Sequence, residues 1–137
     1  MKKVEGKLEF SITDIVRFFR SPYSSWATWA NLEYPGTVFL EKDMVQNSSL
    51  LLRSEKNEDD AKKYLINNYE SVKQIQNPLN SEVESKELIS SKADVIVQPT
   101  LRRENFIGRA DFLIRNKENN LYEVMDAKLA KQVKPEF

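Results

Sequence analysis

The chain has 137 residues, of which 40% are hydrophobic and 31% are charged, and its formal net charge is zero. A chain of this length can bury roughly two-thirds of its unfolded surface, so we expect one domain with a genuine core. It contains no cysteine and no histidine, which excludes thiolate zinc sites, iron–sulfur clusters and histidine-dependent nucleophiles. Any metal must therefore be held by oxygen, which favours Mg²⁺, Mn²⁺ or Ca²⁺.

The distribution of charge permits a nucleic-acid partner without demanding one. Residues 1–30 carry five Lys and Arg against three Asp and Glu, and residues 101–137 carry eight against six. The N-terminal MKKVEGKLEF lacks the apolar run of a signal peptide, and no stretch approaches the length of a membrane span. We therefore expect a cytoplasmic protein with no membrane partner.

The first half of the chain predicts helices and a loop. Ser11, followed three residues later by Asp14, is a variant of the capping box and predicts a helix from Ile12 that ends before Pro22. In the aromatic stretch that follows, Trp26 and Trp29 are expected to pack against the core, with base stacking as the alternative. Residues 34–49 are expected to form a loop with one short strand near 38–40.

A second helix is predicted between residues 55 and 76. An apolar stripe at helical spacing indicates it, formed by Ala61, Tyr64, Leu65, Tyr69, Val72 and Ile75. Residues 77–91 are polar and contain a proline, which is typical of a surface connection with room for a single turn of helix.

The period then changes to that of strands. The runs ADVIVQPTL, FIGRADFLIR and LYEVMDAKLA predict three strands, the first ending before Pro99 and the last two forming a largely buried hairpin around NKENN. The fold class expected is α/β in the mixed α+β sense, with helices packed on a small sheet that has this hairpin at its centre.

Two acidic residues stand within this apolar hairpin. If Asn116 and Leu121 close the loop, Leu113 faces Val124 and Asp111 faces Asp126. Directly opposed Cβ atoms lie roughly 5 Å apart, where like charges are destabilising unless a cation lies between them or one carboxylate is protonated. The register therefore predicts a divalent cation at this position.

Strand alternation adds a lysine to the pair of acids. Lys128 lies two residues beyond Asp126, on the same face and about 7 Å along the strand. The alternative is an exposed ion pair between Asp126 and Lys128, with Asp111 at a frayed strand end and no metal. A register error of one residue would also separate the two carboxylates.

The segment IGRADFLIRNKENNLYEVMDAKLA resembles the catalytic hairpin of RecB-like nucleases of the PD-(D/E)XK superfamily. In that family an Asp in a G-x-x-D setting precedes a D/E-x-K element; here these are Gly108–Asp111 and Asp126-Ala127-Lys128. The resemblance implies that Asp111, Asp126 and the Ala127 carbonyl bind Mg²⁺ or Mn²⁺. It also implies that Lys128 orients the attacking water.

The resemblance extends upstream to two further elements. SITDIVRFFRSP is similar to the family's N-terminal helix before a Cys-Pro; Ser21 stands in the cysteine position, which implies that no iron–sulfur cluster is present. RSEKNEDDAKKYL matches the region whose Glu assists metal binding, with Ser54 and Asn57 in place of the usual Gly and His. Glu58 is the residue implied, and an ordinary acidic residue of a helical first turn is the alternative.

The order helix, strand, hairpin is similar to the first part of the superfamily's restriction-endonuclease-like α-β-β-β-α-β core. The chain ends nine residues after Lys128, so the second helix and fourth strand are expected to lie outside it. We expect a single domain over 1–137, an incomplete core with a helical and loop extension at 1–50 and a core helix with three strands at 51–137.

The function expected is metal-dependent hydrolysis of phosphodiester bonds in DNA, with a helicase or another domain of a longer chain as a further partner. Arg102, Arg103 and Arg109 flank the acidic hairpin in the sequence and are expected to contact the nucleic-acid backbone. Two alternatives remain open: an inactive nucleic-acid-binding or protein-interaction module derived from the same fold, and a structural domain whose acidic hairpin forms only ion pairs.

Overall fold

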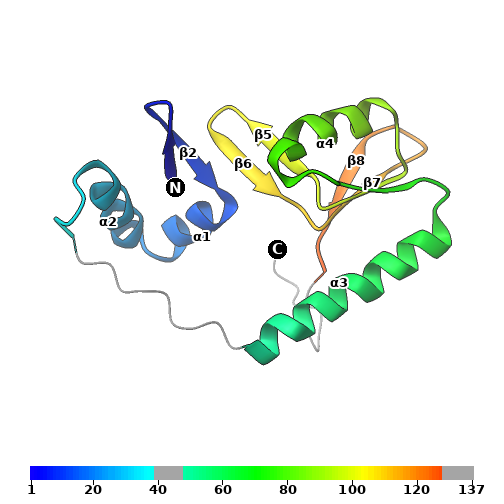
Figure 1. Ribbon diagram of the computed structural model, residues 1–137, viewed down its shortest axis with the longest axis horizontal. Coiled ribbons are helices and arrows are strands. Elements are labelled where there is room, and N and C mark those ends of the chain that lie inside the picture. Colours follow the sequence, from blue (N-terminus) through cyan, green and yellow to red (C-terminus); the bar gives the residue numbers. More distant parts are fainter. Residues whose placement is uncertain (39–47, 128–137) are drawn as a thin grey trace. The chain divides into compact units, whose positions relative to one another are not determined.

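The computed structural model describes residues 1–38 and 48–127, without the side chains of 48–54. The chain divides into two compact units: unit 1 is Met1–Met44 with Thr100–Arg109, and unit 2 is Val45–Pro99 with Ala110–Phe137. In Figure 1 the blue N-terminal elements belong to unit 1, as does the yellow β5–β6 hairpin. The single domain expected over 1–137 stays a prediction, and each unit has its own sheet.

Unit 1 combines two helices with a small sheet. Its elements are β1 (Lys2–Val4), β2 (Lys7–Ser11), α1 (Ile12–Arg20), α2 (Pro22–Glu33), β5 (Thr100–Arg103) and β6 (Phe106–Arg109). The sheet order is β1-β2-β6-β5, in which β2 and β6 run parallel and the other neighbours run antiparallel. Glu5 and Gly6 both have positive φ angles, as a two-residue hairpin turn between β1 and β2 requires.

The two helices of unit 1 meet at Ser21. The capping box predicted at Ser11 and Asp14 is present, and α1 begins at Ile12 as expected. The aromatic stretch after it forms α2, which the sequence analysis did not predict. Ser21 caps its start by accepting a hydrogen bond from the Ser24 N–H (3.1 Å), and Pro22 occupies the first turn, where a proline is tolerated.

Neither tryptophan of α2 is buried. Trp26 is 51% exposed and Trp29 is 36% exposed, whereas the neighbouring Ala27 and Ala30 are buried. Within the described residues, the small side chains of α2 therefore make the close contacts. The expectation that both tryptophans pack against the core is not met there.

Unit 2 contains the predicted core helix and a second sheet. Its elements are α3 (Ser48–Asn68), β3 (Val72–Gln74), a 3₁₀ turn (Pro78–Asn80), α4 (Ser81–Ser90), β4 (Val95–Val97), β7 (Phe112–Arg115) and β8 (Tyr122–Met125). The sheet order is β3-β4-β7-β8, with β3 and β4 parallel and the others antiparallel. Figure 1 shows α3 as the long green helix of this unit.

The core of unit 2 is built on both faces of β4 and β7. Leu65 of α3 packs with Val95, Val97 and Phe112 in a fully buried cluster. Ile96, which points to the other face by strand alternation, is also fully buried, and α4 contacts β4. Buried on both faces, these strands carry the continuous apolar runs that made them visible in the sequence.

Three of the elements expected between residues 55 and 115 differ in the structure. The helix expected up to residue 76 ends at Asn68, and Val72 lies in β3 instead. The connection expected at 77–91 contains the ten-residue helix α4, whose apolar stripe is too short to show a period. The strand expected over 106–115 is divided at Ala110 and Asp111 into β6 and β7, which belong to different sheets.

The hairpin of β7 and β8 is buried on only one of its strands. β7 contributes Phe112 and Leu113 to the core, but Val124, which faces Leu113 from β8, is 64% exposed. β8 is the edge strand of the sheet, and no described strand pairs with its outer edge. The expectation of a largely buried hairpin is therefore wrong for β8.

The described residues form a mixed α and β protein with four α-helices and two four-stranded sheets. This confirms the coarse fold class expected. The short strand expected near 38–40 falls mainly on residues outside the described ranges. No described helix is long and apolar enough to cross a bilayer.

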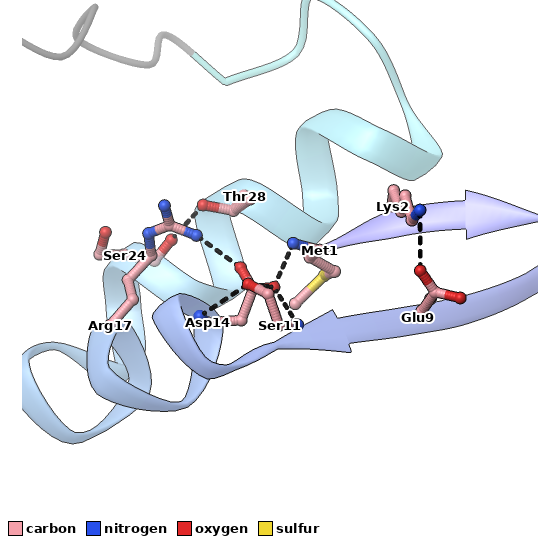
Figure 2. Close-up of polar contacts among 8 residues, drawn as sticks. All are labelled: Met1, Lys2, Glu9, Ser11, Asp14, Arg17, Ser24 and Thr28. Atoms are coloured by element: carbon pink, nitrogen blue, oxygen red, sulfur yellow. Dashed lines mark hydrogen bonds and ion pairs between the residues drawn. The ribbon is translucent and has the colours of Figure 1, made fainter. Parts of the chain in front are cut away.

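A buried carboxylate organises the start of α1. Asp14 is only 4% exposed, and it accepts hydrogen bonds from the Ser11 N–H (2.8 Å), the Ser11 hydroxyl (2.7 Å) and the Arg17 guanidinium (2.8 Å). The α-ammonium of Met1 completes the set (Figure 2). Burial raises the pKa of Asp14, but the ammonium and the Ser11 donors outweigh it and lower this pKa to about 2.

Asp14→Asn should lower the free energy of unfolding at neutral pH by on the order of 1 kcal/mol, since an amide is a weaker acceptor for these donors and the pair with Arg17 is partly screened by solvent. The folded-state pKa is about 2 against an ordinary 3.8. The stabilisation is therefore complete above the ordinary value and is lost as the pH falls towards 2.

Denaturant unfolding of wild type and Asp14→Asn between pH 7 and pH 2 measures this difference. It should shrink steadily below about pH 4. Glu5→Gln, which removes an exposed carboxylate from the same unit, is the matched control and should change little. A difference for Asp14→Asn that stays constant down to pH 2 would contradict the assignment.

Candidate functional site

The register predicted for the acidic hairpin is confirmed. Arg115 pairs with Tyr122, Leu113 pairs with Val124, and the Asn116 N–H donates to the Leu121 carbonyl at 2.8 Å. β7 begins at Phe112 and β8 ends at Met125. Asp111 and Asp126 are therefore the next residues outward on the two strands, at the open end of the hairpin.

The carboxyl groups of Asp111 and Asp126 lie within hydrogen-bonding distance of each other. Asp111 Oδ2 also accepts the Ala127 N–H at 2.7 Å. Burial raises the pKa of Asp111 above its ordinary value, and the hydrogen bond with Asp126 and the charges of Asp126 and Glu58 raise it further. The fold thus holds two acids together where ionisation of both is unfavourable.

At the opposite end of the same sheet, the buried acid is paired with an arginine. Asp94, at the start of β4, is buried and binds the Arg115 guanidinium at 2.7 Å and the Ser71 N–H at 3.2 Å. The hydrogen bond from Arg115 holds the pKa of Asp94 below its ordinary value. Tyr122 closes this end by donating its hydroxyl to the Ala93 carbonyl at 2.7 Å.

Glu58 reaches the site from α3. It lies one helical turn before Ala61 and two turns before Leu65, on the stripe that packs against the sheet. Its Oε2 accepts a hydrogen bond from the Gln98 amide at 3.2 Å, and its charge acts on Asp111. Glu58 thus acts on Asp111 through its charge, and its expected part in metal binding stays a prediction.

A small hollow of about 60 Å³ lies beside Glu58. Side chains from α3, β3, β4 and β7 line it: Glu58, Asp59, Lys62, Gln74, Val97, Gln98 and Phe112. Its lining combines acidic, basic, amide and apolar side chains. It is large enough for water molecules but not for a nucleotide.

The remaining residues of the expected site are placed only in part. The Ala127 side chain packs against the core of unit 2, and its backbone N–H contacts Asp111. Lys128 lies outside the described residues, and its expected approach to the carboxylates stays a prediction.

The three expected arginines all belong to unit 1, whereas the acids belong to unit 2. Arg102 donates to the buried Glu9 at 2.8 Å, which gives it a structural task. Arg103 is exposed on β5. Arg109 is also exposed and pairs in register with Thr100 on β5.

Within the described ranges, no three acidic side chains lie close enough together to hold a metal ion as they stand. The close arrangement is the pair Asp111 and Asp126, with Glu58 acting on it through its charge. This pair provides oxygen donors only, which is the chemistry that Mg²⁺ and Mn²⁺ prefer.

Gln98 is a residue of this site that the sequence analysis did not single out. Its N–H donates to the Asp111 carbonyl at 2.8 Å while its side chain reaches Glu58. The chain gave a weak signal, a polar residue between two β-rich runs and directly before Pro99. Nothing in the sequence indicated its backbone conformation, a φ of 56°.

Comparison with known proteins identifies no relative, because no family model, no curated protein and no solved structure matches the chain.

Substituting the two aspartates at opposite ends of the sheet should have opposite effects on stability in EDTA. Asp111→Asn should raise the free energy of unfolding at neutral pH by up to about 1 kcal/mol, because it removes one of two opposed charges. Asp94→Asn should lower it by about 2 kcal/mol, because it leaves the Arg115 guanidinium without its charged acceptor.

The pH dependence of these two effects separates them from general damage. The folded-state pKa of Asp111 is raised, so its unfavourable contribution grows as the pH rises through that pKa and vanishes in acid. That of Asp94 is lowered, so its favourable contribution is also lost as the pH falls below the ordinary value. Urea titrations should show the variants diverging at pH 7 and approaching wild type as the pH falls below the ordinary pKa of an aspartate; parallel curves would contradict both assignments.

Proposed function

We propose that this protein is a metal-dependent nuclease that hydrolyses phosphodiester bonds of DNA, with Asp111 and Asp126 as its metal ligands. The observation that carries the proposal is the juxtaposition of these two carboxyl groups at the open end of the β7–β8 hairpin, with a raised pKa for Asp111. A fold that pairs Asp94 with an arginine at one end of the sheet leaves two acids facing each other at the other end. A bound cation removes that conflict.

The donors present are those that a magnesium site needs. Mg²⁺ is commonly bound through one or two carboxylates, with waters and substrate phosphate oxygens completing its six ligands. Asp111 and Asp126 supply two carboxylates, and Glu58 adds negative charge that attracts a cation. The absence of a third close acid among the described residues therefore agrees with a cation that completes its coordination from substrate.

The chemistry that such a cation supplies when bound is polarisation of the scissile phosphate and a lower pKa for a bound water. The protein's own groups would orient the reacting groups and neutralise charge on the phosphate. Asp111 is held in place by the Ala127 N–H, whose 2.7 Å hydrogen bond fixes the carboxylate against the end of β8. Lys128, two residues beyond Asp126, would hold the attacking water and balance charge on the phosphate oxygens.

The resemblance of this hairpin to RecB-like nucleases of the PD-(D/E)XK superfamily is the second support for the proposal. It rests on the pattern of Gly108, Asp111, Asp126 and Lys128 and on the confirmed strand register that opposes the two acids. A restriction-endonuclease-like core over the chain belongs to this same proposal, as does the position in the cytoplasm.

The first test is cleavage of labelled single-stranded and double-stranded DNA in Mg²⁺, Mn²⁺ or EDTA. Wild type should cleave only with metal, and Asp111→Asn, Asp126→Asn and Lys128→Ala should each reduce the rate by at least about 100-fold. Glu118→Gln is the matched control, because it removes an exposed acid from the turn of the same hairpin and should leave cleavage unchanged.

The outcomes distinguish the competing functions. Equal cleavage by wild type and all three variants would rule out this site. DNA binding that needs no metal and leads to no cleavage would support an inactive nucleic-acid-binding module. Neither binding nor cleavage, with no stabilisation by Mn²⁺, would support a structural domain.

A second test concerns the arginines of unit 1. Arg103 is exposed on β5, whereas Arg102 holds the buried Glu9. Arg103→Ala should weaken DNA binding severalfold and reduce the slope of log affinity against log salt by about one. Arg102→Ala should mainly lower thermal stability, since it leaves Glu9 with fewer partners.

Fluorescence anisotropy with a labelled oligonucleotide between 50 and 300 mM salt, in EDTA to prevent cleavage, measures the binding. Arg103→Lys retains the charge and should keep most of the affinity. If Arg103→Ala binds with the wild-type slope, Arg103 makes no contact with the DNA backbone.

A further inference from the structure

We infer that Gln98 is a positioning residue of the metal site, which holds the Glu58 carboxylate towards Asp111 and Asp126. This inference rests on the proposed function and adds to it a residue that no motif of the sequence identified. Gln98 directly follows β4 and stands between the helix that carries Glu58 and the strand that follows Asp111.

Gln98 contacts both acidic elements, and it does so with different groups. Its backbone N–H donates to the Asp111 carbonyl at 2.8 Å, which extends the pairing of β4 with β7 by one residue. Its side-chain amide donates to Glu58 Oε2 at 3.2 Å. One residue therefore ties the position of Glu58 on α3 to that of Asp111 at the end of the hairpin.

The backbone of Gln98 is the second, independent observation. Its φ of 56° lies in the left-handed region, which costs a non-glycine residue roughly 1 kcal/mol. If β4 simply continued, Gln98 would point to the face opposite Val97. The left-handed turn redirects the side chain, which lines the same hollow as Val97, Phe112 and Glu58.

A purely structural role would favour a different residue here. Glycine adopts this conformation without cost and would keep the backbone hydrogen bond to Asp111. What glycine lacks is the amide that reaches Glu58. The strain at position 98 therefore accompanies a side-chain contact to Glu58, the acid whose charge acts on Asp111.

The amide donor suits an acid whose negative charge attracts a cation to the neighbouring aspartates. It orients one oxygen of Glu58 without carrying a charge that would compete with the metal, as a lysine or arginine would. Hydrogen bonds of this kind to the residues around a metal typically change its affinity by 10-fold to 100-fold when they are removed.

The test compares wild type with Gln98→Gly and Gln98→Met, measuring Mn²⁺ affinity by isothermal titration calorimetry and thermal stability in EDTA. Gln98→Gly relieves the backbone and should be as stable as wild type or more stable, yet bind Mn²⁺ about 10-fold more weakly. Gln98→Met keeps the length of the side chain without its donor and should lose the same affinity.

Lys92→Gly is the matched control. Lys92 lies in unit 2 with a φ of 58° and an exposed side chain, so glycine gives the same relief of the backbone away from the acids. It should match Gln98→Gly in stability and wild type in Mn²⁺ affinity.

A double-mutant cycle with Glu58→Gln decides whether Gln98 acts through Glu58. If it does, Gln98→Gly should have no further effect on Mn²⁺ affinity when Glu58 is already Gln. Wild-type affinity in Gln98→Gly, or an equal loss with and without Glu58, would overturn the inference and leave the proposed function intact. A wild-type protein that binds no Mn²⁺ would overturn the proposed function and this inference together.

Discussion

The pairing of β4 with β7 is the constraint on which the rest of unit 2 depends, because these two strands are buried on both faces. Val95 and Phe112 pack with Leu65 of α3, while Ile96 and Leu113 fill the other face. A shift of one residue in this pairing would exchange the two faces and misplace every side chain of the core. The positions of Asp94 at one end and Asp111 at the other follow from that single register.

The two ends of this pairing are opposite in electrostatic character. Asp94 and Arg115 form a buried, hydrogen-bonded pair, which closes one end of the sheet. At the other end, Asp111 lies beside Asp126. Burial, the Asp126 carboxyl group and the charge of Glu58 all make ionisation of Asp111 less favourable. The Asp94–Arg115 pair stabilises one end of the sheet, while the other end holds carboxyl groups that repel each other. Sites where a fold tolerates such repulsion are candidates for function.

The sequence was sufficient where local chemistry decides the structure and insufficient where long-range packing does. The capping residues of α1 and the opposition of Asp111 and Asp126 were predictable, since both depend on spacing along one or two neighbouring elements. The left-handed turn at Gln98 and its contact with Glu58 were not, because they join residues 40 positions apart in the chain. The division of 106–115 between two sheets was also invisible, because each half keeps the apolar composition of a strand.

The base of the β5–β6 hairpin has a consequence for how this chain can be taken apart. The hairpin leaves unit 2 after Pro99 and returns at Ala110, and the Ala110 N–H donates to the Pro99 carbonyl at 3.1 Å. The two points of departure are thus already neighbours, so a very short linker can join them. We therefore expect that residues 100–109 can be deleted and replaced by a short linker, so that the acidic end of the sheet and α3 are expressed without them, as an inserted segment is removed from a host domain.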